Sequence, residues 1–292
     1  MNADEKRDLP NLQWFPGHMK KARETIRENL KLVGVAVELL DARIPLSSAN
    51  PMLEEILEGK PRMAVLNKSD LADADMTRRW VEFFRSRGLE AVAVDSVKGA
   101  GLKQMAKLAE ELARPGSEKL VSKGARRRAA RCMILGIPNV GKSSLINRLA
   151  GSAKTKTADK PGVTRAKQWI RIGANLELLD TPGVLWPKFE DMSVGLKLAF
   201  TGAINDEVCD LEQVAALLME TLQRRYPERL AERFRLEQPL PEDGQELLEA
   251  VGRKRGCLMK GGRIDMVKAQ RIVITEFRGG KLGCITLDEL PE

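Results

Sequence analysis

The stretch that most constrains the fold of this chain is a glycine-rich loop at residues 136–143, which reads GIPNVGKS. It fits the pattern G-x-x-x-x-G-K-[ST], the P-loop, in which the backbone turns so that successive N–H groups can hold phosphate oxygens. An apolar run at 132–135 precedes the loop and an amphipathic segment at 144–149 follows it. A strand entering such a loop and a helix leaving it predict a phosphate-binding site, although a glycine-rich turn can also be merely structural.

Each residue type in the P-loop has a chemical role. Gly141 lets the chain turn, Lys142 reaches the β- and γ-phosphates, and the Ser143 hydroxyl is expected to ligate Mg2+. The following helix adds the positive end of its dipole. The expected nucleotide contacts are Asn139, Val140, Gly141, Lys142, Ser143 and Ser144.

A second motif, N-K-S-D, follows the apolar run at 63–66. The Asp70 carboxylate can accept two hydrogen bonds from the N1–H and exocyclic amine of guanine, and a polar site of this kind rejects the wrong ligand by roughly 10^4. Asn67 is expected to tie neighbouring loops together, while the stem of Lys68 lies against the base. The motif could instead cap a helix that begins near Asp73, but beside a P-loop it predicts a guanine nucleotide.

A third loop, at residues 95–101, follows the apolar run at 91–94 and is rich in glycine. We expect its backbone at Ser96, Val97 and Lys98 to contact the base. A plain turn into the next helix would account for the same glycines, so this prediction depends on the other two motifs.

Two further motifs lie beyond the P-loop. The sequence PGVTR is typical of a switch loop, and its Thr164 hydroxyl could ligate Mg2+ when a γ-phosphate is present. Strands expected at 168–172 and 176–179 then lead to D-T-P-G. There, Asp180 would hold Mg2+ through water and the Gly183 N–H would sense the γ-phosphate.

The balance of charge indicates the kind of partner. The chain carries 49 Lys and Arg against 41 Asp and Glu, and this net charge of +8 favours a polyanion. The run at 115–131 reads as a basic linker, for which a solvated charge run is the default and a phosphate-contacting patch the alternative. Beyond residue 208 the pattern is helical, with a basic set at Arg253, Lys254, Arg255, Lys260, Arg263, Lys268 and Arg271.

Several classes of protein are excluded by composition. The four cysteines form no C-x-x-C pair, so neither a zinc site nor a disulfide framework is indicated. No apolar run approaches the roughly 18 residues needed to span a bilayer, and the first residues lack a signal-peptide core. We expect a cytoplasmic protein with no membrane partner.

Together these patterns predict an α/β fold. We expect a six-stranded, mostly parallel sheet with flanking helices in a P-loop domain at 1–204, and a smaller, mainly helical domain at 205–292. The expected strands are 32–40, 63–66, 91–94, 132–135, 168–172 and 176–179.

The order of the motifs is unusual, because a simple P-loop domain places the P-loop after its first strand, whereas about 130 residues precede it here. Moving the last three strands of such a domain to the front produces the observed order. With WFPGHM at 14–19, DARIP at 41–45 and PNVGKSS at 138–144, the chain resembles the circularly permuted GTPases of ribosome assembly.

This resemblance implies a GTP-hydrolysing assembly factor that acts late in maturation of the large (50S) ribosomal subunit. The GTP form would dock on a precursor of that subunit, contact its ribosomal RNA through the helical domain and leave after hydrolysis. The resemblance also matches Asn139 to a P-loop asparagine that helps to hold K+ beside the phosphates. The free protein is expected to be monomeric.

Hydrolysis poses a problem at one position. Ras-like enzymes orient the attacking water with a Gln directly after the D-x-x-G glycine, and here that residue is Val184. Turnover is therefore expected to be slow alone and to be stimulated by ribosomal particles. The resemblance assigns a part in hydrolysis to His18, which could instead cap or pack the helix that begins there. The expected catalytic residues are His18, Lys142, Thr164 and Gly183.

Two alternatives remain at this point. An RNA-binding protein could use GTP occupancy as a switch with little turnover, which Val184 makes tenable. An ATP-dependent enzyme is disfavoured by the guanine motif at residues 67–70.

Overall fold

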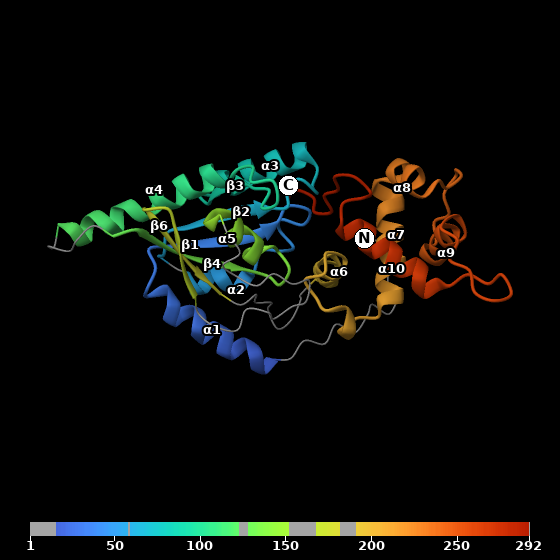
Figure 1. The fold of residues 1–292 in the computed structure, drawn as a ribbon, viewed down its shortest axis with the longest axis horizontal. Helices are drawn as coiled ribbons and strands as arrows, with labels where there is room; N and C mark the ends of the chain where they lie inside the picture. Colours follow the sequence, from blue (N-terminus) through green and yellow to red (C-terminus); the bar gives the residue numbers. More distant parts are fainter. Residues whose placement is uncertain (1–15, 58, 123–127, 152–167, 182–190, 292) are drawn as a thin grey trace. The chain divides into compact units, whose positions relative to one another are not determined.

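The computed structural model describes residues 16–57, 59–122, 128–151, 168–181 and 191–291 (Figure 1). These residues form two compact units. The sheet unit holds the described residues up to 181 together with 286–291, and the helical unit holds 191–285. From the sequence we expected one domain boundary, after residue 204. In the structure, residues 191–204 belong to the helical unit and residues 286–291 belong to the sheet unit.

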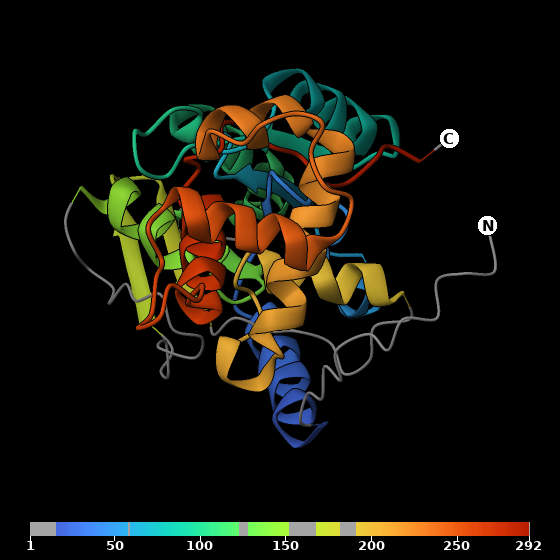
Figure 2. The same cartoon turned by 90° about the vertical axis from the view of Figure 1, so that its right-hand side faces the viewer.

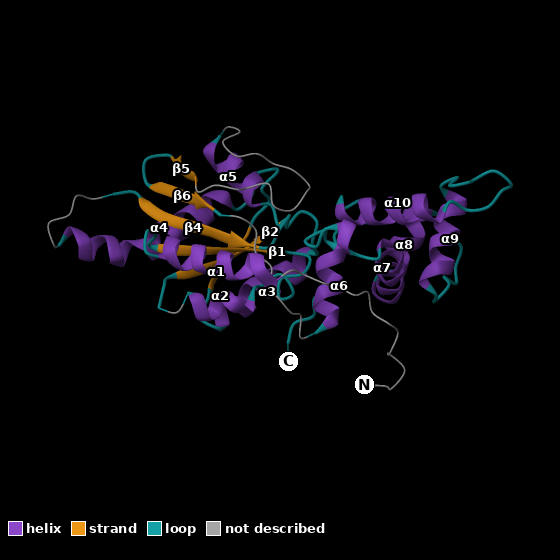
Figure 3. Cartoon of the chain, turned by 90° about the horizontal axis from the view of Figure 1, so that it is seen from below, coloured by secondary structure: helices purple, strands orange, loops and turns teal. Residues whose placement is uncertain are grey.

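Six strands form the centre of the sheet unit, in the order β3-β2-β1-β4-β6-β5. Five are parallel, and β5 runs antiparallel to β6 (Figure 3). This confirms the predicted six-stranded, mostly parallel sheet. The strands are β1 (Val35–Asp41), β2 (Arg62–Asn67), β3 (Glu90–Ala93), β4 (Ala130–Gly136), β5 (Gln168–Ile172) and β6 (Leu176–Asp180).

The strand order brings the motifs that precede the P-loop in the sequence next to the P-loop in space. The first three strands form one side of the sheet, and β1 pairs in parallel with β4, the strand that enters the P-loop. In register, Leu39 lies beside Gly136 and Asp41 lies beside Asn67. The carboxyl ends of β1, β2 and β4 therefore meet at one edge, which is where open α/β sheets place their ligands.

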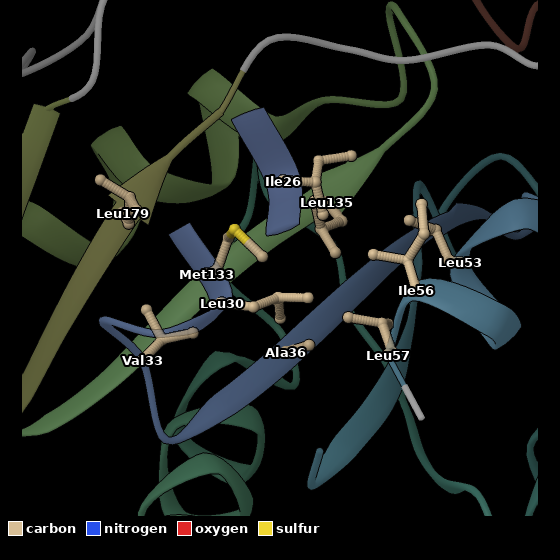
Figure 4. Close-up of a cluster of buried hydrophobic side chains, with 10 residues drawn as sticks. All are labelled: Ile26, Leu30, Val33, Ala36, Leu53, Ile56, Leu57, Met133, Leu135 and Leu179. Atoms are coloured by element: carbon tan, nitrogen blue, oxygen red, sulfur yellow. The ribbon is translucent and has the colours of Figure 1, made fainter. Parts of the chain in front are cut away.

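One face of the sheet is covered by α1 (Pro16–Leu30), α2 (Pro51–Ile56) and α3 (Ala74–Ser86). Figure 4 shows Ile26 and Leu30 of α1 packed with side chains of α2 and of the central strands. Trp80 and Phe84 of α3 pack on the part of the same face formed by β2 and β3. Hydrophobic burial of these helix faces fixes the layer.

The opposite face is covered by α4 (Leu102–Val121) and α5 (Lys142–Ala150). Met105 and Ala109 of α4 are buried, as are all residues of β1. A strand buried on both faces is the expected condition for a parallel sheet.

The linker predicted from residue 115 is wrong in its first part. The structure continues α4 through Pro115 to Val121, so the helix occupies the start of that run. Pro115 leaves the carbonyl oxygen of Glu111 without its helical donor, and because Glu111 and Pro115 are exposed, water can satisfy that oxygen.

The helical unit consists of α6 (Met192–Phe200), the short 3-10 helix η1 (Asp206–Val208), α7 (Leu211–Arg225), α8 (Pro227–Phe234), α9 (Gly244–Lys254) and α10 (Met266–Arg278) (Figure 2). Helix α7 contacts each of the other four α-helices. Leu218 and Leu222 of α7, Leu247 of α9 and Val273 of α10 are fully buried. This confirms the predicted helical C-terminal part. No helix in the described part of the chain is long and apolar enough to cross a membrane.

Candidate functional site

The P-loop joins the end of β4 to the start of α5 through a tightly turned backbone. A side chain at Gly136 would place its Cβ 2.6 Å from the carbonyl oxygen of Leu39. One at Gly141, where φ is +100°, would lie 2.4 Å from Nδ2 of Asn67. A methyl group at either position would collide with a neighbouring strand or with the Asn67 side chain, which explains why both positions are glycine.

Lys142 lies inside the loop that it is expected to serve. Its Nζ donates hydrogen bonds to the carbonyl oxygens of Gly136 at 3.0 Å and Ile137 at 2.7 Å. Burial lowers the pKa of Lys142 to about 8, although the nearby Asp180 carboxylate opposes the shift. An anion beside this buried ammonium would favour its charged form, so phosphate binding and protonation of Lys142 support each other.

The first turn of α5 follows directly from the P-loop. Gly141 is the N-cap residue and makes no side-chain hydrogen bond to the helix, so the first N–H groups of α5 have no side-chain cap from that position. Asn139 precedes it with a left-handed φ of 54°, a conformation uncommon outside glycine.

Asn67, the last residue of β2, connects three of the predicted motifs. Its Nδ2 donates to the carbonyl oxygen of Val140 at 2.7 Å. Its Oδ1 accepts hydrogen bonds from the backbone N–H of Ser96 at 3.3 Å and from Ser96 Oγ at 2.5 Å. The predicted tie between loops is thus present: the guanine motif, the P-loop and the third loop meet at one buried amide.

Lys68 and Asp70 follow Asn67 at the same edge of the sheet. Lys68 has a left-handed φ of 59°, and its Nζ donates to Oδ2 of Asp41 at 2.9 Å. Asp70 is half-buried. The ion pair between Lys68 and Asp41 was not predicted from the sequence, where Asp41 contributed only to a family resemblance.

The third loop is held by two side chains that sequence reasoning missed. Asp95 Oδ1 accepts hydrogen bonds from the N–H groups of Val97 at 2.8 Å and Lys98 at 2.9 Å. Arg148 of α5 donates to the carbonyl oxygen of Lys98 at 2.9 Å. Contact of this backbone with a base stays a prediction. To bind a base, the N–H groups of Val97 and Lys98 would have to donate to it in addition to, or in place of, Asp95 Oδ1. An aspartate before a glycine-rich turn is the signal that could have revealed the turn.

Asp180 ends β6, the strand next to β4. It is buried, and its charge acts on Lys142 across the P-loop. Thr181 follows, and its hydroxyl donates to the carbonyl oxygen of Ile134 in β4. The start of the D-T-P-G motif is therefore fixed to the strand that carries the P-loop.

Some of the predicted site residues lie outside the described residues. These are Thr164, Gly183 and Val184. His18 lies in the first turn of α1, which confirms that a helix begins there, but its side chain is outside the described part. The roles assigned to these four residues stay predictions.

The oxygen donors of the site suit Mg2+ with a nucleotide as co-ligand. In the described part of the chain, no three His, Cys, Asp or Glu side chains come together as a metal site. Ser143 in the first turn of α5 and Asp180 at the end of β6 supply a hydroxyl and a carboxylate. Mg2+ is commonly bound by one or two protein oxygens plus phosphates and water, so this donor set fits.

Comparisons with known proteins agree with this geometry. A family described as 50S ribosome-binding GTPase matches residues 131–236. The chain is 52% identical to ribosome biogenesis GTPase A of Bacillus cereus over 281 residues, which cover 96% of this chain and 94% of that protein. It is 50% identical to ribosome biogenesis GTPase A of Priestia megaterium, over 96% and 98% of the two chains.

A solved structure is similar over the same length. GNP-bound YlqF from T. maritima matches with a TM-score of 0.62 and 29% sequence identity, covering 92% of this chain and 98% of that one. The likeness therefore includes both the sheet unit and the helical unit.

Proposed function

Because this chain belongs to the ribosome biogenesis GTPase A family, we propose that it hydrolyses GTP to GDP and phosphate during late maturation of the large (50S) ribosomal subunit. The observation that carries the proposal is the side chain of Asn67, which joins the P-loop at Val140 to the third loop at Ser96. A phosphate cradle and a guanine motif held together by one amide form a guanine-nucleotide site.

The nucleotide would lie along the edge formed by β1, β2 and β4. The P-loop backbone and Lys142 would bind the phosphates, and Asp70 would select guanine by accepting from its N1–H and amine. Ser96, Val97 and Lys98 would line the base on its other side. The burial of Lys142 and the positive end of α5 support this placement, since both favour an anion at the loop.

We assign the Mg2+ site to Ser143, Thr164 and Asp180, and a K+ site to Asn139. When bound, Mg2+ would neutralise charge on the β- and γ-phosphates. Asp180 is placed for this role because it ends β6, the strand beside the one that leads into the P-loop. Asn139 lies within the P-loop and has a left-handed φ of 54°.

Hydrolysis would be slow without a partner. Val184 cannot orient water as a glutamine does, so the ribosomal precursor would supply or position the missing group. His18 is the candidate on this chain, with Thr164 and Gly183 sensing the γ-phosphate. An alternative is a protein that uses GTP occupancy as a switch with little turnover.

The basic side chains of the helical unit are suited to ribosomal RNA. All seven members of the set predicted from sequence are exposed, and they lie on α9, on α10 and on the loop between these helices. Leu258 and Met259 in that loop are also exposed. Exposed cations with apolar neighbours can bind phosphates and pack against unstacked bases. We propose that the free protein is a cytoplasmic monomer and that this surface binds the large-subunit precursor.

Nucleotide binding and co-sedimentation test the proposal. The wild-type chain is expected to bind GTP and to exclude ATP, and Asp70→Asn is expected to remove the preference for guanine. With the non-hydrolysable GTP analogue GNP, the chain should co-sediment with large-subunit precursors, and with GDP it should not. Equal binding of GTP and ATP, or co-sedimentation that is the same with both nucleotides, would contradict the proposal.

A further inference from the structure

Residues 286–290, here called the return segment, pack on the sheet unit although they follow the last helix of the helical unit. Thr286, Leu287 and Asp288 are buried, with exposed fractions of 0%, 1% and 3%. The segment forms no strand, so its burial depends on side chains and single hydrogen bonds. Such burial of a polar segment requires specific partners.

The first set of partners lies in the loop after β1. Asp288 accepts two hydrogen bonds from Ser47, one from its N–H at 2.7 Å and one from its hydroxyl at 2.6 Å. The N–H of Leu287 donates to the carbonyl oxygen of Arg43 at 2.7 Å. The return segment therefore fixes both ends of residues 43–47.

The second set lies at the start of α3, just after the guanine motif. The hydroxyl of Thr286 accepts a hydrogen bond from the N–H of Asp73 at 3.1 Å. Asp73 is the N-cap of α3 and accepts from the N–H groups of residues 75 and 76. Leu290 packs against the cluster that contains Trp80. The segment thus joins the loop after β1 to the helix after β2.

A buried ion network surrounds Asp41, and its partner Arg43 also accepts the hydrogen bond from Leu287. Asp41 Oδ1 accepts from the backbone N–H and Nε of Arg43 at 3.1 and 2.9 Å. Its Oδ2 accepts from Arg43 Nη2 at 2.8 Å and from Lys68 Nζ at 2.9 Å. Burial alone would raise the pKa of Asp41, but the Arg43 and Lys68 charges hold it well below its usual range. The carboxylate is therefore ionised and fully paired.

The network ends on a guanine-motif residue whose backbone is strained. A left-handed φ at a lysine is unfavourable and persists only where surrounding contacts impose it. The ion pair with Asp41 fixes the end of the Lys68 side chain, and its apolar stem is the part expected to lie against the base. The orientation of that stem thus depends on the position of Asp41.

From this chain of contacts we infer that Asp41 and the return segment are positioning elements of the guanine site, because they hold Lys68 in the orientation that packs against the base. The inference rests on the proposed guanine-nucleotide site and adds to it residues from the far end of the chain. Affinity for the nucleotide then depends on Asp288, whose carboxylate accepts two hydrogen bonds from Ser47.

A double-mutant cycle on GDP affinity tests the inference. Asp288→Ala removes the acceptor for Ser47 and is expected to weaken GDP binding about tenfold, which corresponds to about 1.4 kcal/mol. Lys68→Met keeps the apolar stem but removes its ion pair with Asp41. If Asp288 acts through Lys68, Asp288→Ala should weaken binding less than twofold in the Lys68→Met background.

The control is Glu82→Ala, which removes the same charge from an exposed position on α3 and should leave GDP affinity unchanged. Asp288→Ala should weaken binding of inosine diphosphate by the same factor as binding of GDP, because packing of the Lys68 stem against the base does not require the exocyclic amine. A GDP affinity of Asp288→Ala equal to that of the wild type, or the same loss in both backgrounds, would overturn the inference. A wild-type chain that binds no GDP would overturn the proposed function itself.

Discussion

Replacing Asn67 with alanine would remove the amide that joins the P-loop to the third loop. The substitution deletes one hydrogen bond to the Val140 carbonyl and two from Ser96, all in a buried setting. A buried polar group left without its partner costs about 1–3 kcal/mol, so the loss of a carbonyl partner and an N–H partner totals about 2–6 kcal/mol. If about half of the lower figure, about 1 kcal/mol, destabilises the nucleotide-bound form alone, GDP affinity falls about fivefold.

Titration with a fluorescent GDP analogue measures this loss of affinity. Thermal unfolding of the nucleotide-free chain measures how much of the cost lowers the stability of the fold. The matched control is Asn175→Ala, which removes an asparagine side chain from the exposed turn between β5 and β6. Its GDP affinity and melting temperature should equal those of the wild type. If Asn67→Ala binds GDP within twofold of the wild type, Asn67 does not organise the site.

Three further predictions concern catalysis, stability and RNA. His18→Ala is expected to lower GTP turnover in the presence of large ribosomal subunits while leaving GTP affinity unchanged; unaltered turnover would remove His18 from the mechanism. Burial raises the pKa of Glu38 from 4.5 to about 7, so the folded chain keeps a proton that the unfolded chain releases, and stability falls as pH rises across that interval. Glu38→Gln can still accept the hydrogen bond from the Asn50 N–H. Measured by urea titration, this substitution should increase the free energy of unfolding at pH 8 by about 1–3 kcal/mol and have little effect at pH 4. An equal gain at both pH values would contradict burial of the Glu38 charge as the cause. Arg263→Glu should weaken RNA binding and reduce its salt dependence by about one ion, whereas Lys103→Glu on the exposed side of α4 should not; equal effects of the two reversals would exclude the helical unit as the specific RNA surface.

Short motifs made the centre of the fold and of the site predictable. The turn from β4 into α5 requires glycine for steric reasons, so its pattern alone locates a strand and a helix. The end of β2 was predictable because Asn67 begins a motif whose chemistry needs the carboxyl edge of a sheet. In both cases the constraint lies within a few residues of sequence.

Contacts between distant residues could not be predicted in the same way. Ser47 and Asp288 are 241 positions apart, and nothing in either neighbourhood indicates the other. The ion network at Asp41 was equally hidden, since an aspartate at a strand end suits a turn as well as a buried pair. At Pro115, local propensity predicted a break, but an exposed helix tolerates the residue and α4 continues.

Chain connectivity gives these distant contacts a functional meaning. Within the described residues, the chain passes between the two units after the D-T-P-G motif and again before the return segment. The first of these connections follows the motif expected to sense the γ-phosphate, and the second leads into contacts with the loop that holds Lys68. Under the proposed function, RNA bound to the helical unit would bias both the phosphate side and the base side of the site, by differential contacts in two states.

GTP turnover with and without large-subunit precursors tests the central claim most directly. The wild-type chain should hydrolyse GTP slowly alone, because Val184 cannot orient the attacking water, and the precursors should accelerate hydrolysis at saturating GTP. The same particles should not accelerate ATP hydrolysis. Precursors are thus expected to accelerate hydrolysis of GTP alone. If precursors leave GTP turnover unchanged, the protein is a passive switch and not a GTP-hydrolysing assembly factor.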